Sequence, residues 1–237
     1  MTRERQAATV ALVHGLGRSV RSMQTLATRL TAAGFAPSTL DYPSRSDRLD
    51  VLIDLVAERL ADLAAGDGPL HAAGHSMGGL ILRGALARLP RERLGRLVMI
   101  GSPNQGVRLL ARLGRLDLLA RVFGAPVHDL VRGAPALQRL ATPPMETGCI
   151  AGTRAFAAFS PAAYASFLLF PFTPRDGTVE VESVRFAGMA DFVTVPASHM
   201  FMCDHPEVVR QTIHFLQHGR FAPDEAAPLP AARRVRS

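Results

Sequence analysis

The chain has 237 residues, of which 48% are hydrophobic and 20% charged, as expected for a globular protein with a real core. The net charge of +7 comes from arginines scattered over presumed helix surfaces, without a helix-turn-helix or an aromatic-interleaved basic patch, so we expect no nucleic-acid partner. The apolar runs are far shorter than a bilayer span, which excludes stable membrane insertion.

The first apolar run and the cysteine content both favour a cytoplasmic location. The N-terminal stretch MTRERQAATVALVHG is basic and then apolar, but it is short and has no cleavage site. We therefore interpret it as a first strand and not as a signal peptide. Cys149 and Cys203 do not make a disulfide framework, and we predict reduced core thiols.

Strands and helices are predicted to alternate along the chain. Strands are expected at residues 9–15, 35–43, 69–75, 94–103, 145–152 and 191–198, and helices at residues 23–33, 50–65, 79–89 and 206–218. Strands rich in Val, Ile and Leu that alternate with helices predict an α/β fold, with a mainly parallel sheet of about six strands covered on both faces.

Three segments interrupt this alternation within a predicted domain of residues 8–219. Residues 104–140 form a helical insertion, residues 153–175 are rich in aromatic side chains, and residues 221–237 read as a disordered basic tail. In the insertion, Leu109, Leu113 and Leu116 share one face of a continuous helix. The insertion is either a cap over the site described next or a surface helix packed on the core.

The stretch AAGHSMGGL at residues 72–80 places one serine, Ser76, between a predicted strand and a predicted helix. The pattern G-x-S-x-G is typical of a nucleophile elbow, a sharp turn that exposes a serine hydroxyl at its tip. Glycines two residues before and after the serine keep Cβ atoms out of the turn. A Gly-rich turn with a solvated serine is the alternative, so partners for Ser76 must be found.

A nucleophilic serine needs a base whose pKa is near neutrality, and histidine is the first choice. His199 follows the last predicted strand directly, whereas His205 lies at the start of the final helix. Ligands bind beyond the carboxyl ends of parallel strands, which favours His199.

The third residue must orient the histidine. Asp176 lies in an Asp-Gly loop, Asp191 begins the last strand at the wrong edge of the sheet, and Asp204 is expected to cap the final helix. The chain order Ser76, Asp176, His199 favours Asp176, because α/β-hydrolase triads have this order.

An oxyanion hole supplies backbone N–H groups to the developing negative charge of an acyl-transfer intermediate. Met77, directly after the serine, is one expected donor. Leu16, in the loop HGLGRS after the first strand, is the other. An ordinary turn is the alternative interpretation of that loop. Further side chains are expected to contact the substrate: His14, Gly15, His75, Leu109, Leu113, Phe167 and Phe170.

The segments VHGLGRS, GHSMGGL, IGSPNQG, DGTV and the terminal histidine before a helix resemble the α/β-hydrolase superfamily, and within it the small bacterial esterases and lipases. The resemblance covers residues 8 to 219 and starts at the family's third strand. It implies ester hydrolysis without a metal or cofactor. The loop HGLG departs from the HGGG pattern, which argues against esters of bulky tertiary alcohols.

These observations predict a serine hydrolase that cleaves a small-molecule or lipid ester through an acyl-enzyme on Ser76. An acyltransferase with the same three residues is one alternative. Whether water, or instead an alcohol or thiol, accepts the acyl group depends on how well the site excludes water. A non-catalytic binding protein on the same fold is the other. The sequence does not indicate an oligomeric state.

Overall fold

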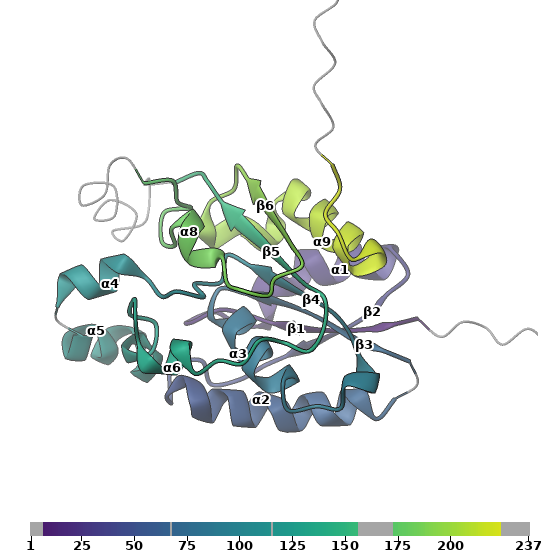
Figure 1. The fold of residues 1–237 in the computed structure, drawn as a ribbon, viewed down its shortest axis with the longest axis horizontal. Helices are drawn as coiled ribbons and strands as arrows, with labels where there is room; N and C mark the ends of the chain where they lie inside the picture. The colour runs from purple at the N-terminus through teal and green to yellow at the C-terminus, as the bar shows by residue number, and fades with distance from the viewer. Residues whose placement is uncertain (1–6, 67, 115, 156–172, 224–237) are drawn as a thin grey trace, which may run out of the picture.

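The computed structural model describes residues 7–66, 68–114, 116–155 and 173–223. Its centre is a parallel sheet of six strands in the order β2-β1-β3-β4-β5-β6 (Figure 1). The strands are β1 (Thr9–Val13), β2 (Ala36–Leu40), β3 (Leu70–His75), β4 (Leu94–Ile100), β5 (Thr147–Gly152) and β6 (Asp191–Val195). The expected sheet of about six parallel strands is confirmed.

Helices follow most of the strands. The α-helices are α1 (Gln24–Ala32), α2 (Leu49–Ala64), α3 (Met77–Leu86), α4 (Arg108–Leu113), α5 (Leu116–Phe123), α6 (Pro135–Gln138), α8 (Val181–Val184) and α9 (Pro206–His218). Short 3-10 turns are η1 (Val20–Met23), η2 (Arg91–Arg93), η3 (Ala125–His128) and η4 (His199–Asp204). No helix in the described ranges has the length and apolar character needed to cross a bilayer.

Two hydrophobic cores cover the two faces of the sheet. Successive side chains of a strand point to opposite faces, so Val10 and Leu12 belong to one core and Ala11 and Val13 to the other. The first core packs against α1 and α9, and the second against α2 and α3. Every residue of β3 is buried, because its strand lies in the middle of the sheet.

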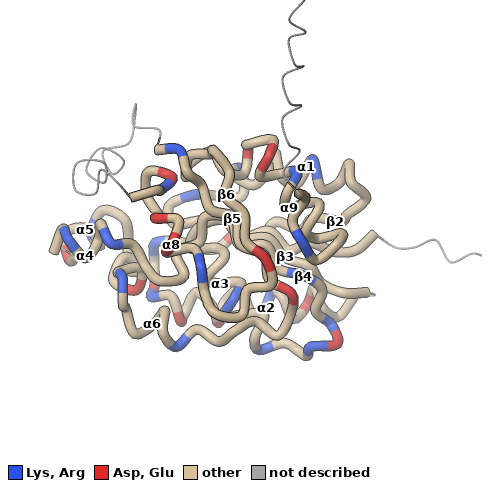
Figure 2. Tube along the Cα trace, turned by 45° about the horizontal axis from the view of Figure 1, so that its top comes forward, with Lys and Arg blue, Asp and Glu red and all other residues tan. Residues whose placement is uncertain are grey.

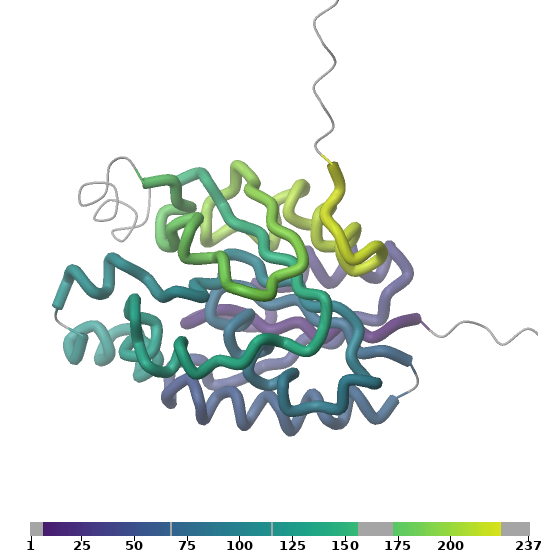
Figure 3. The backbone as a smooth tube through the Cα atoms, viewed as in Figure 1, coloured from purple at the N-terminus to yellow at the C-terminus, as the bar shows by residue number. Residues whose placement is uncertain are grey.

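Parallel strands end at the same edge of the sheet, and this edge positions the candidate site. The loops that follow β1 and β3, and the turn after β6, all lie there. Figures 1 and 3 show α4 and α5 beyond the same edge, at the far left of the view. The insertion therefore lies at the end of the molecule that carries Ser76.

The insertion differs from the continuous helix expected. α4 ends at Gly114, which has a φ of +61°, and α5 begins separately at Leu116. The expected shared face is therefore wrong: Leu109 is buried at 4% exposure, whereas Leu113 is 41% exposed. A glycine in the left-handed region ends a helix because other residues adopt that conformation only at a cost.

The packed domain extends past the expected end at residue 219. Phe221 and Ala222 are buried, and their N–H groups donate to Asp191 Oδ2 and Gln211 Oε1. The rest of the expected tail, residues 224–237, and the aromatic side chains Phe167 and Phe170 lie outside the described residues.

Candidate active site

Ser76 stands at a strained turn between β3 and α3. It has φ +53° and ψ −123°, and among the described residues it is the one non-glycine with a positive φ. Such backbone costs roughly 1–3 kcal/mol and persists where surrounding contacts hold it, as the 2.8 Å bond from Ser76 N–H to the Ile100 carbonyl does here. A Cβ at Gly74 would lie 2.6 Å from Gly79 N, and one at Gly78 would collide with the backbone of β1. The turn therefore requires its flanking glycines.

One histidine links Ser76 to a carboxylate. His199 Nε2 lies 3.0 Å from Ser76 Oγ, and His199 Nδ1 lies 2.7 Å from Asp176 Oδ2. The backbone N–H of His199 also donates to the Asp176 carbonyl at 3.0 Å. The His199 and Asp176 side chains are 8% and 1% exposed. The structure thus brings together the three residues selected from the sequence.

The loop around Asp176 fixes the orientation of its carboxylate. Oδ1 accepts hydrogen bonds from the N–H groups of Thr178 and Val179, at 3.0 and 2.8 Å. The other oxygen, Oδ2, is left to accept from His199 Nδ1–H. An ionised carboxylate only accepts, so the proton lies on Nδ1 and the Nε2 lone pair faces the serine hydroxyl. That tautomer can remove a proton from Ser76.

The alternative candidates for the acid and the base lie away from Ser76. Asp191 begins β6 and accepts from Phe221 N–H, at the opposite end of the strand from His199. Asp204 is exposed at the end of η4, and His205 precedes α9. Within the described residues, none of the three has a hydrogen bond to Ser76.

The buried side chain of His75 stabilises the site through a hydrogen bond and does not line it. Its side chain is 4% exposed, and Nε2–H donates to the His199 carbonyl at 2.9 Å. Burial, with a contribution from His199, lowers the pKa of His75 to about 3, so the ring is neutral. The structure therefore does not place His75 where it was expected to contact the substrate. Its hydrogen bond instead holds the backbone of His199, the candidate base.

His14 is also enclosed, which is not the placement expected for a substrate contact. Its ring is fully buried and stacks on Tyr42, with centroids 4.6 Å apart. Its Nδ1 lies 3.0 Å from the Gly15 carbonyl oxygen, and its Nε2 lies 3.1 Å from Asp41 Oδ1. No sequence pattern indicated Asp41 as its partner.

The bond from His14 orients the next peptide unit. The Gly15 carbonyl also accepts from Arg18 N–H at 3.2 Å. In a planar trans peptide the carbonyl and the N–H point in opposite directions, so the Leu16 N–H points away from these donors. A Cβ at Gly15 would lie 3.1 Å from Ser76 Cβ, which places this loop against the serine.

Met77 offers a second backbone donor. It is the first residue of α3, and the first N–H groups of a helix have no partner within the helix. Neither the Met77 nor the Leu16 N–H has an acceptor within the described part of the chain. The partial positive charge at the N-terminus of α3 adds to the attraction for an anion beside Ser76.

An ion pair between an exposed arginine and a buried aspartate fastens the insertion to the rest of the domain. Asp129 is 3% exposed and accepts from Arg48 Nε and from Leu49 N–H, both at 2.8 Å. Val107 N–H donates to the Leu130 carbonyl at 2.7 Å and closes the base of the insertion. Sequence reasoning missed this pair, because Arg48 and Asp129 are 81 positions apart.

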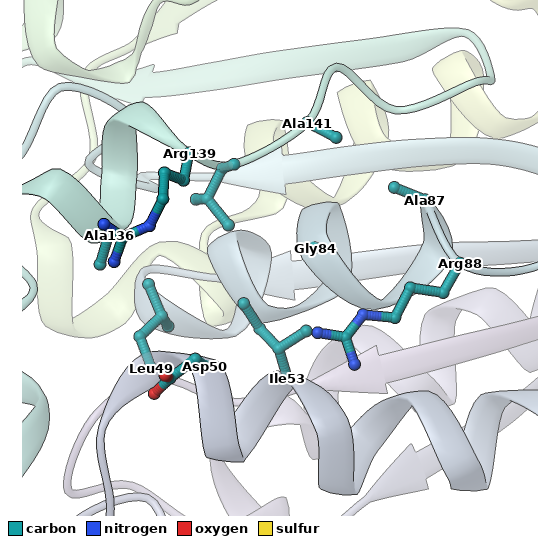
Figure 4. A pocket seen from close by; sticks show the side chains of 10 residues that line it. Leu49, Asp50, Ile53, Gly84, Ala87, Arg88, Ala136, Arg139 and Ala141 are labelled. Carbon is teal, nitrogen blue, oxygen red and sulfur yellow. The ribbon is translucent and has the colours of Figure 1, made fainter.

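A separate hollow lies away from Ser76. It has a volume of about 320 Å³ and lies between α2, α3 and the segment from α6 to Ala141, and its lining includes Ile53, Gly84, Arg88 and Arg139 (Figure 4). None of Ser76, Asp176 and His199 lines it. In the described ranges, acidic, histidine and cysteine side chains form no group of three that could hold a metal ion.

Fold and site together define an α/β hydrolase. The model of the alpha/beta hydrolase family matches residues 10–228, and the chain therefore belongs to this family. No curated protein matches the sequence significantly.

Solved structures share the fold at low sequence identity. The mature lipase BlEst2 of Bacillus licheniformis has a TM-score of 0.72 and 18% identity, and the match covers 90% of each chain. Phospholipase PlaB of Legionella pneumophila has a TM-score of 0.70 and 17% identity, over 90% of this chain and 60% of PlaB. EstA of Clostridium botulinum has a TM-score of 0.61 and 15% identity, over 91% and 88%.

Proposed function

We propose that the protein is a serine hydrolase that cleaves carboxylic esters through an acyl-enzyme on Ser76. The observation that carries the proposal is the hydrogen-bonded series Ser76–His199–Asp176, with Nε2 3.0 Å from Oγ and Nδ1 2.7 Å from the carboxylate. A binding protein without catalysis would need neither the hydrogen-bonded order of the three residues, nor the tautomer of His199, nor the strained backbone of Ser76. Their presence together favours an enzyme over that alternative.

In the first half-reaction, Ser76 Oγ bonds to the ester carbonyl carbon while His199 Nε2 takes the hydroxyl proton. The tetrahedral intermediate collapses, the C–O bond to the alcohol breaks, and His199 returns the proton to the departing alcohol. Water then attacks the acyl-enzyme with His199 again as base, and the acid leaves. Asp176 keeps its negative charge and stabilises the imidazolium.

The backbone N–H groups of Leu16 and Met77 would bind the oxyanion of each intermediate. Both are without an acceptor in the described structure, and both lie beside Ser76 in sequence or in space. Loss of one such donor costs roughly 3 kcal/mol in other serine hydrolases. His14 has a positioning role here, through the Gly15 carbonyl.

The choice of an ester is supported by the fold and by its neighbours. BlEst2 is a lipase and PlaB a phospholipase, and both share this fold with the present chain. A small-molecule or lipid ester is therefore the substrate class that we propose. The chemistry described uses side chains and backbone groups of this chain and no cofactor.

A panel of p-nitrophenyl esters tests the proposal. The wild-type protein should release p-nitrophenol with saturation kinetics, and Ser76→Ala should reduce kcat to the background rate while keeping the wild-type melting temperature. Wild-type protein without activity on any ester of the panel would overturn the proposal. Transfer of the acyl group to added alcohols in preference to water would instead identify an acyltransferase.

A further inference from the structure

An arginine lies against the loop of residues 14–19, here called the oxyanion loop because it carries the candidate donor Leu16. A Cβ at Gly17, the next residue, would lie 2.9 Å from Arg45 Nη2 and 3.1 Å from Arg45 Nε. The guanidinium of Arg45 therefore occupies the space beside Gly17, where a side chain would otherwise stand. Within the described residues, no hydrogen bond or ion pair engages this guanidinium.

The insertion fixes the backbone of Arg45. Ala125 N–H donates to the Arg45 carbonyl at 3.2 Å, and a Cβ at Gly124 would lie 2.6 Å from Arg45 Cα. The loop after β2 is also tied to the oxyanion loop, because Gly17 N–H donates to Ser44 Oγ at 3.0 Å. Arg45 thus lies at the junction between the insertion and the loop beside Ser76.

Ser76 is close enough for one substrate to contact both residues. A Cβ at Gly15 would lie 3.1 Å from Ser76 Cβ, and Gly15 is two residues from Gly17. These contacts place Arg45 Nη2 at most roughly 16 Å from Ser76 Cβ. The true separation is shorter, because Arg18 N–H donates to the Gly15 carbonyl at 3.2 Å and closes a turn. An extended acyl chain of six carbons on Ser76 has a comparable length.

The acidic side chains on the neighbouring segments do not neutralise Arg45 by direct contact. Each has another partner: Asp41 with His14, Asp47 with Ser46, Asp117 with His128 and Asp129 with Arg48. Figure 2 shows basic and acidic positions interspersed along α4 and α5 at this end of the molecule, so the overall charge of the surface selects no ligand. The selection comes instead from the place of the Arg45 guanidinium beside the oxyanion loop.

We propose that Arg45 binds a carboxylate of the ester substrate, remote from the reacting carbonyl, and thereby selects esters that carry this second, anionic group. The planar fork of an arginine presents two parallel N–H donors that match the two oxygens of a carboxylate. The inference rests on the proposed ester hydrolysis at Ser76 and names its substrate class. The same recognition serves a carboxylate on the acyl part or on the alcohol part, and the substrates below distinguish the two.

Two matched pairs of esters test the proposal. Mono-p-nitrophenyl adipate and p-nitrophenyl hexanoate differ in the terminal carboxylate of the acyl chain. The hexanoyl esters of 4-hydroxybenzoate and of methyl 4-hydroxybenzoate differ in the charge of the alcohol part. The measured quantity is the ratio of kcat/KM for the anionic ester to kcat/KM for the neutral ester. Both esters of a pair use the same serine and oxyanion donors, so the ratio cancels a general effect of a substitution on catalysis.

Arg45→Gln should lower this ratio about fivefold for one of the two pairs, the upper range for an ion pair at an exposed side chain. Arg45→Lys keeps the charge without the fork and should lower it about twofold. The control Arg29→Gln removes an exposed arginine from α1 and should leave both ratios unchanged. Salt near 1 M should reduce the ratio of the wild-type protein, because it screens charges over roughly 3 Å.

Equal ratios for the wild type and Arg45→Gln with both pairs would overturn the proposal, and so would an equal fall in Arg29→Gln. In either case, hydrolysis of the neutral esters would leave the proposed function standing. Absence of hydrolysis of all four esters by the wild type would overturn the proposed function and this inference together. Unchanged circular dichroism spectra of the variants confirm that each one folds.

Discussion

Replacing Asp176 with asparagine should inactivate the protein by forcing the wrong tautomer on His199. The amides of Thr178 and Val179 both donate to Oδ1, so the asparagine carbonyl oxygen keeps that position. The amide NH₂ then faces His199 Nδ1, which must accept. The proton moves to Nε2, where it faces Ser76 Oγ and prevents the ring from acting as a base.

The alternative amide orientation is costly. Turning the NH₂ toward the two backbone donors would leave both N–H groups unsatisfied beside a residue that is 2% exposed. Each buried unsatisfied donor costs about 1–3 kcal/mol. The same exchange in a serine-protease triad lowers kcat about 10⁴-fold, or about 5 kcal/mol in activation free energy. We expect a loss of this size for Asp176→Asn.

Steady-state kinetics on p-nitrophenyl butyrate measure the effect. We expect kcat to fall and KM to change little, because the carboxylate acts through His199 and has no place at the substrate. Asp204→Asn, at an exposed carboxylate in the same region, is the matched control and should keep wild-type kinetics. Near-normal turnover in Asp176→Asn, with a folded protein, would refute the assignment and make Asp204 the next candidate.

Three further changes test other parts of the site. His199→Ala should lower kcat by several orders of magnitude, whereas His205→Ala should mainly lower the melting temperature; the reverse result would identify His205 as the base. His14→Phe keeps the stack on Tyr42 but loses both hydrogen bonds, so kcat should fall roughly tenfold at constant KM, as measured on the same ester. Finally, kcat/KM should rise from acetyl to medium-chain esters by up to about 0.8 kcal/mol per CH₂; a flat wild-type profile would contradict an acyl-binding role for the insertion.

Much of the fold could be predicted because buried parallel strands leave a direct pattern in the sequence. β3 (LHAAGH) is mostly small and apolar and ends directly before Ser76, and the tight packing of that turn requires Gly74 and Gly78. His199 could be selected because it follows β6 at the edge where parallel strands end. These features depend on residues close together in the chain.

The contacts that could not be predicted join distant loops. The pairs Arg48–Asp129 and His14–Asp41 are set by three-dimensional packing, and no periodicity relates their members. The prediction of one continuous helix across residues 108–116 used helical periodicity alone. It did not account for Gly114, whose left-handed backbone ends α4. Phe221 lies in an Ala- and Pro-rich stretch, yet its ring packs 4.9 Å from that of Phe215.

Covalent labelling of the nucleophile tests the central claim most directly. A fluorophosphonate probe reacts with an activated serine, and peptide mass spectrometry then locates the modified residue. We predict one modification, on Ser76, that is absent from Ser76→Ala and slowed by orders of magnitude in His199→Ala. Labelling at another residue, or labelling that persists in folded Ser76→Ala, would contradict the account.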